Sequence, residues 1–133
     1  MSRLTVFLAR FIGLFTVLIV VGLLVRGSTT VEAAVADAPV MLVYAIISLA
    51  IGLAMILGHN VWSGGALPVV VTLFGWLMLA KGLMLLFVPP HALKQIFGHM
   101  HYGEHYYLYV APSLVIGLYL TWAGFTASSS SAK

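Results

Sequence analysis

Four long apolar runs set the strongest constraint on how this chain folds. They cover residues 4–25, 39–57, 67–88 and 106–127. A helix needs about 20 mostly apolar residues to cross the hydrocarbon core of a bilayer, and each run is close to that length. The runs are apolar on every face and lack the alternation of polar and apolar residues that is typical of membrane β-strands. We therefore predict an all-α protein, an integral membrane bundle of four helices.

The composition supports a membrane location and excludes some functions. Hydrophobic residues make up 62% of the 133 residues and charged residues 7%, whereas soluble domains carry about 25% charged residues. The net charge of +3 comes from scattered residues and forms no basic patch, so no nucleic-acid partner is expected. The chain has no cysteine, which excludes disulfides, thiol catalysis and cysteine zinc sites. We predict one transmembrane domain over residues 1–127, followed by a polar tail over residues 128–133.

The first connection carries signals for helix starts. Thr29 and Glu32 have the spacing of a capping box, which predicts a short surface helix before the second span. Asp37 followed by Pro39 suits an N-cap and a proline in the first helical turn. Residues 34–36 have the small-x-small form of a signal cleavage site, but about ten residues separate them from the first run, so we expect a retained anchor.

The third connection predicts a short amphipathic helix that lies on the membrane between the third and fourth spans. Its polar side contains Lys94 and Gln95, and its apolar side is formed by residues at helical spacing: Leu93, Ile96, Phe97 and Met100.

The distribution of charge predicts the orientation. Lys and Arg are in excess on the cytoplasmic side of membrane proteins. Arg3, Arg10 and Lys133 lie near the two termini, whereas acidic residues offset the basic ones in the first and third connections. We therefore expect both termini to be cytoplasmic.

Small residues recur along each span at the spacing of one helix face. In a bilayer, such residues allow helices to approach closely, and this close packing drives their association. The expected packing residues are Gly13, Ser48, Gly52, Gly75, Gly82, Ser113, Gly117, Thr121 and Gly124. Two interpretations remain open: these rows pack within one bundle, or one of them, first of all that of the fourth span, docks a second copy or a larger partner.

Lys81 is a charge inside a span, and such charges are functional hypotheses by default. It lies about 10 Å from the end of its helix, which is farther than a lysine side chain reaches to the headgroups. It either snorkels to the headgroups where the bilayer is locally thinner, or bonds to backbone carbonyls or water, or pairs with an acid (Glu104, Glu32 or Asp37), or binds an anionic ligand. Arg10, near the start of its span, is expected to reach the headgroups.

Four histidines in the third connection are candidate metal ligands: His91, His99, His101 and His105. Neutral imidazoles suit zinc, copper and iron. However, Gly98 and Gly103 interrupt the helix that would fix their geometry, and Glu104 is the one acid nearby to support them. With the neighbouring tyrosines, the segment fits better an aromatic belt at the membrane surface. A metal or haem site is kept as an alternative, and no cofactor is predicted.

Catalysis has little support in the sequence. There is no pair of carboxylates inside a span, no glycine-rich phosphate loop and no nucleophile elbow. We therefore predict that the protein is not an enzyme.

One stretch, residues 58–89, carries a His-Asn-x-Trp turn and then an apolar helix with Gly-Trp and Lys-Gly before a proline. This pattern resembles a set of small bacterial four-span inner-membrane proteins. The resemblance covers about a quarter of the chain, and the residues that carry it are His59, Asn60, Trp62, Gly75, Trp76, Lys81, Gly82 and Pro89. It implies four spans in a bacterial inner membrane and points to His59 and Lys81, but it implies no activity.

Together these patterns predict a non-catalytic membrane protein that acts through helix packing, as a homo-oligomer or as an accessory subunit of a larger membrane complex. Two alternatives remain: a small transporter or channel that uses Lys81, and a metal- or haem-binding module on the outer face. The lipid bilayer is the one partner that composition alone identifies.

Overall fold

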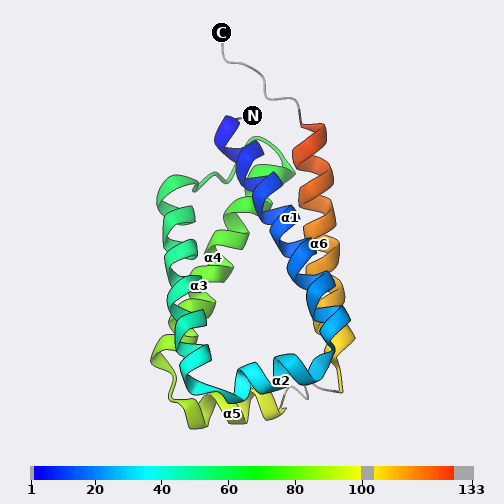
Figure 1. Ribbon diagram of the computed structural model, residues 1–133. Helices are drawn as coiled ribbons and strands as arrows, with labels where there is room; N and C mark the ends of the chain where they lie inside the picture. Colours follow the sequence, from blue (N-terminus) through cyan, green and yellow to red (C-terminus); the bar gives the residue numbers. More distant parts are fainter. Residues whose placement is uncertain (1, 100–103, 128–133) are drawn as a thin grey trace.

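The computed structural model describes residues 2–99 and 104–127, and every regular element within these ranges is an α-helix. In chain order the helices are α1 (Arg3–Arg26), α2 (Ser28–Ala36), α3 (Ala38–Gly58), α4 (Ala66–Phe87), α5 (Pro90–His99) and α6 (Tyr106–Thr126) (Figure 1).

Helices α1, α3, α4 and α6 have the length and apolar composition needed to cross a membrane. Their bounds lie within one residue of those predicted from the apolar runs. The chain is therefore a multi-pass membrane protein, and the predicted all-α, four-span fold is confirmed. The short helices expected on the surface, α2 and α5, also form, and both lie across the ends of the spans (Figure 1).

Local signals define where the helices begin and end. The Ser2 hydroxyl caps α1 by accepting from the Thr5 backbone N–H at 3.1 Å. Gly27, with φ of +82°, takes the left-handed conformation that separates α1 from α2. The Asp37 carboxylate accepts from the backbone N–H of Val40 at 3.1 Å, so this residue is the expected N-cap of α3.

The four spans form two pairs. Helix α3 packs along α4, its neighbour in sequence, and α1 packs along α6, the last helix of the chain (Figure 1). At one end, called here the narrow end, lie the start of α1, the end of α6 and the α3–α4 loop, and the two pairs converge there. A shared core at this end takes Ile12 from α1, Met55 from α3, Val71 from α4 and Leu120 from α6.

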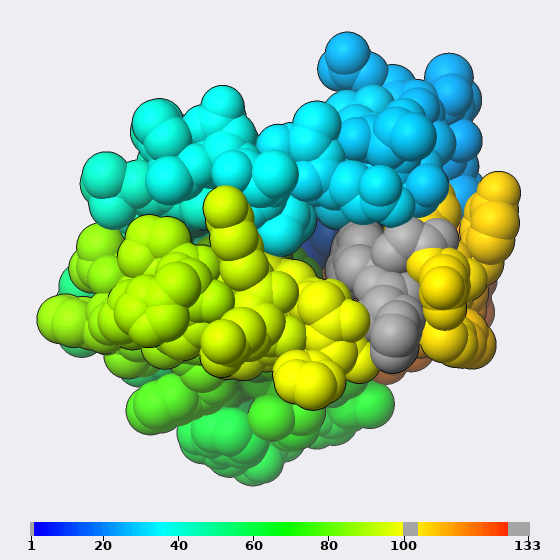
Figure 2. Space-filling model, turned by 90° about the horizontal axis from the view of Figure 1, so that it is seen from below, coloured from blue at the N-terminus to red at the C-terminus, as the bar shows by residue number. Residues whose placement is uncertain are grey.

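At the opposite end, called here the wide end, the two pairs diverge (Figure 1). The buried residues there form two separate clusters instead of one shared core. One cluster belongs to α1, α2 and α6 and contains Val20, Tyr106 and Val110. The other belongs to α3, α4 and α5 and contains Leu85 and Leu93. Seen from below, α2 and α5 lie next to each other across this end of the molecule (Figure 2).

Candidate functional site

Lys81 has a partner that the sequence did not suggest. Its ammonium donates a hydrogen bond to the Tyr44 hydroxyl and lies 4.4 Å from the centre of the Tyr44 ring. Among the described residues, no carboxylate forms an ion pair with Lys81. The contact combines a hydrogen bond with a cation–π interaction, and both lower the cost of a charge inside a span. The site is therefore a positive charge that a neutral phenol stabilises but does not neutralise.

Helical register places this Lys81–Tyr44 pair on the faces that turn towards the other two spans. Lys81 lies seven residues, or about two turns, after Phe74, which packs on the shared core at the narrow end. Tyr44 lies seven residues before Ile51, which packs on the same core. The two residues thus continue the inner faces of α4 and α3 into the wide end, where α1 and α6 have diverged. Tyr44 is accordingly 42% exposed in the monomer.

The facing helices present apolar side chains at the same level. On α1, Ile19 lies two turns after the buried Ile12 and is 48% exposed. On α6, Ile116 lies about one turn before the buried Leu120 and is 43% exposed. The inner faces are therefore closed at the narrow end and open at the wide end.

Ser113 is not in the helix contact predicted for it. It is exposed, and its hydroxyl donates to the Tyr109 carbonyl of its own helix at 3.4 Å. The residues of α6 that pack against α1 at this level are Val110 and Leu114, and Ser113 is rotated away from them towards the divergence. The structure therefore places Ser113 in no helix contact among the described residues, and its part in packing stays a prediction.

The other predicted packing residues lie in contacts within the chain. A Cβ on Gly13 would lie 2.5 Å from the backbone nitrogen of Thr121, and one on Gly82 would lie 2.5 Å from that of Leu49. Backbones this close leave no room for a side chain. The α1–α6 contact holds Gly13, Gly117, Thr121 and Gly124, and the α3–α4 contact holds Ser48, Gly52, Gly75 and Gly82. Gly117, Thr121 and Gly124 of the α6 row are therefore occupied by α1 within the chain.

Arg10 of α1 contacts α6 within the chain. Its Nε donates to the Gly124 carbonyl at 2.8 Å, and its guanidinium lies 5.0 Å from the centre of the Phe125 ring. The absence of a side chain on Gly124 allows this approach, because a Cβ there would lie 3.0 Å from the Arg10 backbone nitrogen. The expectation that Arg10 extends to the headgroups did not include this interhelical bond.

A buried histidine connects the two helix pairs at the narrow end. His59, in the α3–α4 loop, is 3% exposed. Its Nε2 lies 2.9 Å from the Thr5 hydroxyl of α1, and its Nδ1 lies 3.2 Å from the Thr72 hydroxyl of α4. Both threonines are buried. The resemblance pointed to His59, but the residue pattern did not reveal either partner.

The hydrogen bonds of Thr72 assign the tautomer of this histidine. The Thr72 oxygen lies 2.9 Å from the Val61 carbonyl and 3.0 Å from the Pro68 carbonyl, and its single hydrogen is drawn to these shorter contacts. Nδ1 of His59 therefore carries the ring hydrogen and donates to Thr72, so Nε2 accepts from Thr5. This His59 bridge, formed by Thr5, His59 and Thr72, is a structural connection with every polar atom engaged.

The candidate metal ligands are not brought together in the part of the chain that the structure describes. His91, His99 and His105 are all exposed, and His101 lies outside the described residues. Within residues 2–99 and 104–127, no three histidine, aspartate or glutamate side chains are close enough to hold one metal ion.

Comparisons of the chain with protein-family models, curated proteins and solved structures give no match.

Proposed function

We propose that the protein is a non-catalytic membrane subunit that acts through helix packing, and that its partner helix packs between the diverging pairs at the wide end. The partner is a second copy or a component of a larger complex. The observation that supports this proposal is that the inner faces are buried at the narrow end and exposed at the wide end.

The space between the diverging pairs has to be filled by lipid chains or by another helix. A four-helix bundle ordinarily encloses its core along its whole length. Here Ile12 and Leu120 are buried, whereas Ile19 and Ile116 farther along the same faces are about half exposed. Apolar chains of lipid satisfy such faces poorly compared with a close-packed helix, because helix association in a bilayer depends on shape and on interhelical hydrogen bonds. A partner with a polar acceptor at the level of Lys81 would add such a bond.

A second candidate function is a small transporter or channel for anions. The one observation that favours it is the position of Lys81. Its ammonium has the Tyr44 hydroxyl and no carboxylate as a partner among the described residues, and it is on a face that the other pair does not cover. Loss of anion flux in liposomes on Lys81→Met, with an intact fold, would favour this function over the packing subunit.

We further propose the bacterial inner membrane as the location, with both termini in the cytoplasm. This orientation rests on the basic residues near the termini, and the location rests on the resemblance. Single cysteines at Ser63 and Gln95 test it, because Ser63 is in the loop at the narrow end and Gln95 is in α5 at the wide end. An impermeant thiol reagent should label Gln95→Cys in cells with a permeabilised outer membrane and spare Ser63→Cys; the reverse pattern would invert the orientation.

The packing proposal is tested by cross-linking in native membranes. The chain has no cysteine, so one introduced residue carries a photoreactive label at a defined position. Ile19 and Val21 are a matched pair on α1, since they are 48% and 47% exposed but point to nearly opposite sides of the helix. We expect label at Ile19→Cys to give an adduct of discrete protein mass and label at Val21→Cys to give lipid adducts.

The mass of the unlabelled protein after purification in a mild detergent then identifies the stoichiometry. A dimer, or a co-purified protein whose mass added to that of this chain equals the mass of the adduct, supports the proposal. Lipid adducts from both positions, together with a monomeric mass, would contradict it.

A further inference from the structure

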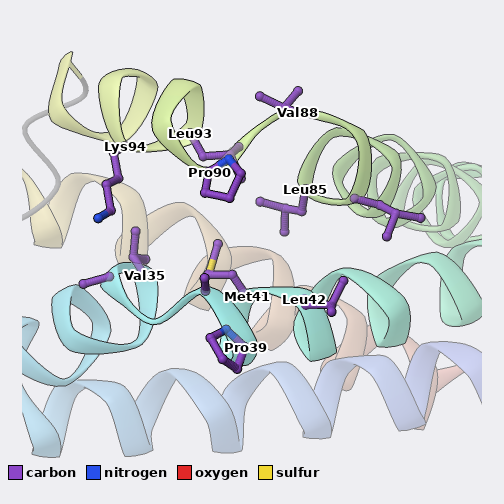
Figure 3. A pocket seen from close by; sticks show the side chains of 12 residues that line it. Val35, Pro39, Met41, Leu42, Leu85, Val88, Pro90, Leu93 and Lys94 are labelled. Atoms are coloured by element: carbon purple, nitrogen blue, oxygen red, sulfur yellow. The ribbon is translucent and has the colours of Figure 1, made fainter.

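A cavity of about 420 Å³ lies at the wide end, outside the Lys81–Tyr44 pair. One wall is formed by the end of α2 and the first turns of α3, and the other by the end of α4 and the start of α5 (Figure 3). Its walls are largely apolar and include Val35, Met41, Leu42, Leu85 and Leu93. This volume is within the range of small-molecule sites, which are about 300–1,000 Å³.

One charged side chain lines this cavity. Lys94 extends from α5 towards Val35 of α2 across the cavity (Figure 3). It is exposed, and within the described residues it forms no hydrogen bond or ion pair. The cavity therefore combines an apolar interior with an amine that is free to bind an anion.

The place of the cavity in the fold determines which ligand reaches it. It is bounded by the ends of two spans and by two helices that lie across the spans, which is the level of the lipid headgroups (Figure 1). Phospholipids are the amphiphiles present there at high concentration. An apolar wall with a basic residue at the headgroup level matches an acyl chain joined to a negatively charged headgroup.

We propose that this cavity is a binding site for one anionic phospholipid, with the end of an acyl chain against Leu42 and Leu85 and the phosphate on the Lys94 amine. The site is separate from the proposed helix-packing surface, because it is formed at the ends of α2, α3, α4 and α5, about one helical turn beyond Lys81 and Tyr44.

The experiment is a competition between two lipids with identical acyl chains. Purified protein in detergent receives equal amounts of palmitoyl-oleoyl phosphatidylglycerol and palmitoyl-oleoyl phosphatidylcholine, and native mass spectrometry measures the ratio of the two lipids bound as a single equivalent. One basic residue near a membrane surface is expected to favour the anionic lipid about fivefold. Lys94→Gln should lower the ratio to about one.

Two matched controls separate the site from general surface effects. Arg26→Gln removes an exposed cation from the end of α1, outside the cavity, and should leave the ratio unchanged. Leu42→Trp fills the cavity and should reduce binding of both lipids, whereas Leu53→Trp, at a similarly exposed position of α3 outside the lining, should not.

A ratio that persists in Lys94→Gln would overturn the assignment of the phosphate site. An equal fall in Arg26→Gln would reduce the effect to nonspecific charge, and undiminished binding in Leu42→Trp would place the acyl chain outside the cavity. Each of these three results contradicts the proposal.

Discussion

Replacing His59 by phenylalanine removes the connection between the two helix pairs while keeping an aromatic ring in the buried space. The substitution eliminates the hydrogen bonds to Thr5 and Thr72. Thr72 keeps its backbone partners, and Thr5 keeps the Ser2 hydroxyl at 2.7 Å, so neither threonine is left without a partner. Interhelical hydrogen bonds in membrane proteins contribute about 0.6 kcal/mol each on average and up to about 1.7. We therefore expect His59→Phe to lower the free energy of unfolding by about 1–3 kcal/mol.

The assay is reversible unfolding in mixed micelles by titration with sodium dodecyl sulfate, followed by circular dichroism. Combining His59→Phe with Thr5→Val forms a double-mutant cycle, in which the bridge predicts a coupling energy of about 0.6–1.7 kcal/mol. Thr126→Val is the control, because the Thr126 hydroxyl is exposed and bonds within its own helix. Its effect should stay within about 0.5 kcal/mol. If the effects of His59→Phe and Thr5→Val simply add within about 0.3 kcal/mol, the His59 bridge does not join the helices in the way described.

Three further predictions follow from contacts within the spans. Gly13→Ala should lower the free energy of unfolding by about 1–3 kcal/mol, because its Cβ meets the α6 backbone, whereas Gly22→Ala on the same helix meets nothing within 4 Å and should be tolerated. Gly117→Leu should destabilise the α1–α6 pair instead of dissociating an oligomer, so unfolding measured beside native mass distinguishes the two; loss of assembly with unchanged stability would contradict the packing described here. Lys81→Met should leave stability unchanged or raise it, because it removes a charge inside a span, while Tyr44→Phe should lower stability by up to about 1 kcal/mol in the same titration; a large loss in Lys81→Met would instead indicate an acidic partner for Lys81.

The sequence predicted the spans well because their lengths follow from one physical requirement, the thickness of the bilayer. Asp37 predicts the start of α3 because its side chain can cap a helix. The helical spacing of apolar residues around Leu93 predicts α5. These signals depend on residues close together in the chain, and such features can be read without knowing the fold.

The contacts of the candidate site could not be read in this way. The partners of His59 are 54 residues before it and 13 residues after it. No local motif marks either threonine as a hydrogen-bond partner. For Lys81 the sequence suggested headgroups, backbone carbonyls, water, an acid or an anionic ligand, whereas the partner is a phenol on the adjacent span. The divergence of the two pairs has no local signal, since each span is long and mostly apolar on all sides. Ser113 illustrates this limit of the sequence. It has the spacing of a packing residue, but at its level α6 contacts α1 through Leu114.

The pairing of the first span with the last has a consequence for biosynthesis. As the chain is made, α3 and α4 can associate as soon as both are inserted, but α1 has no helix to pack along until α6 follows at the end of translation. During that interval Thr5, His59 and Thr72 are already present, so the His59 bridge can hold α1 beside the α3–α4 hairpin, together with the packing of Ile12 in the shared core, before α6 is inserted. In a chain without this bridge, α1 would move away from the α3–α4 hairpin and would have to return to it by diffusion in the bilayer. Such a defect would lower the yield of correctly folded protein more than it lowers the stability of the folded protein.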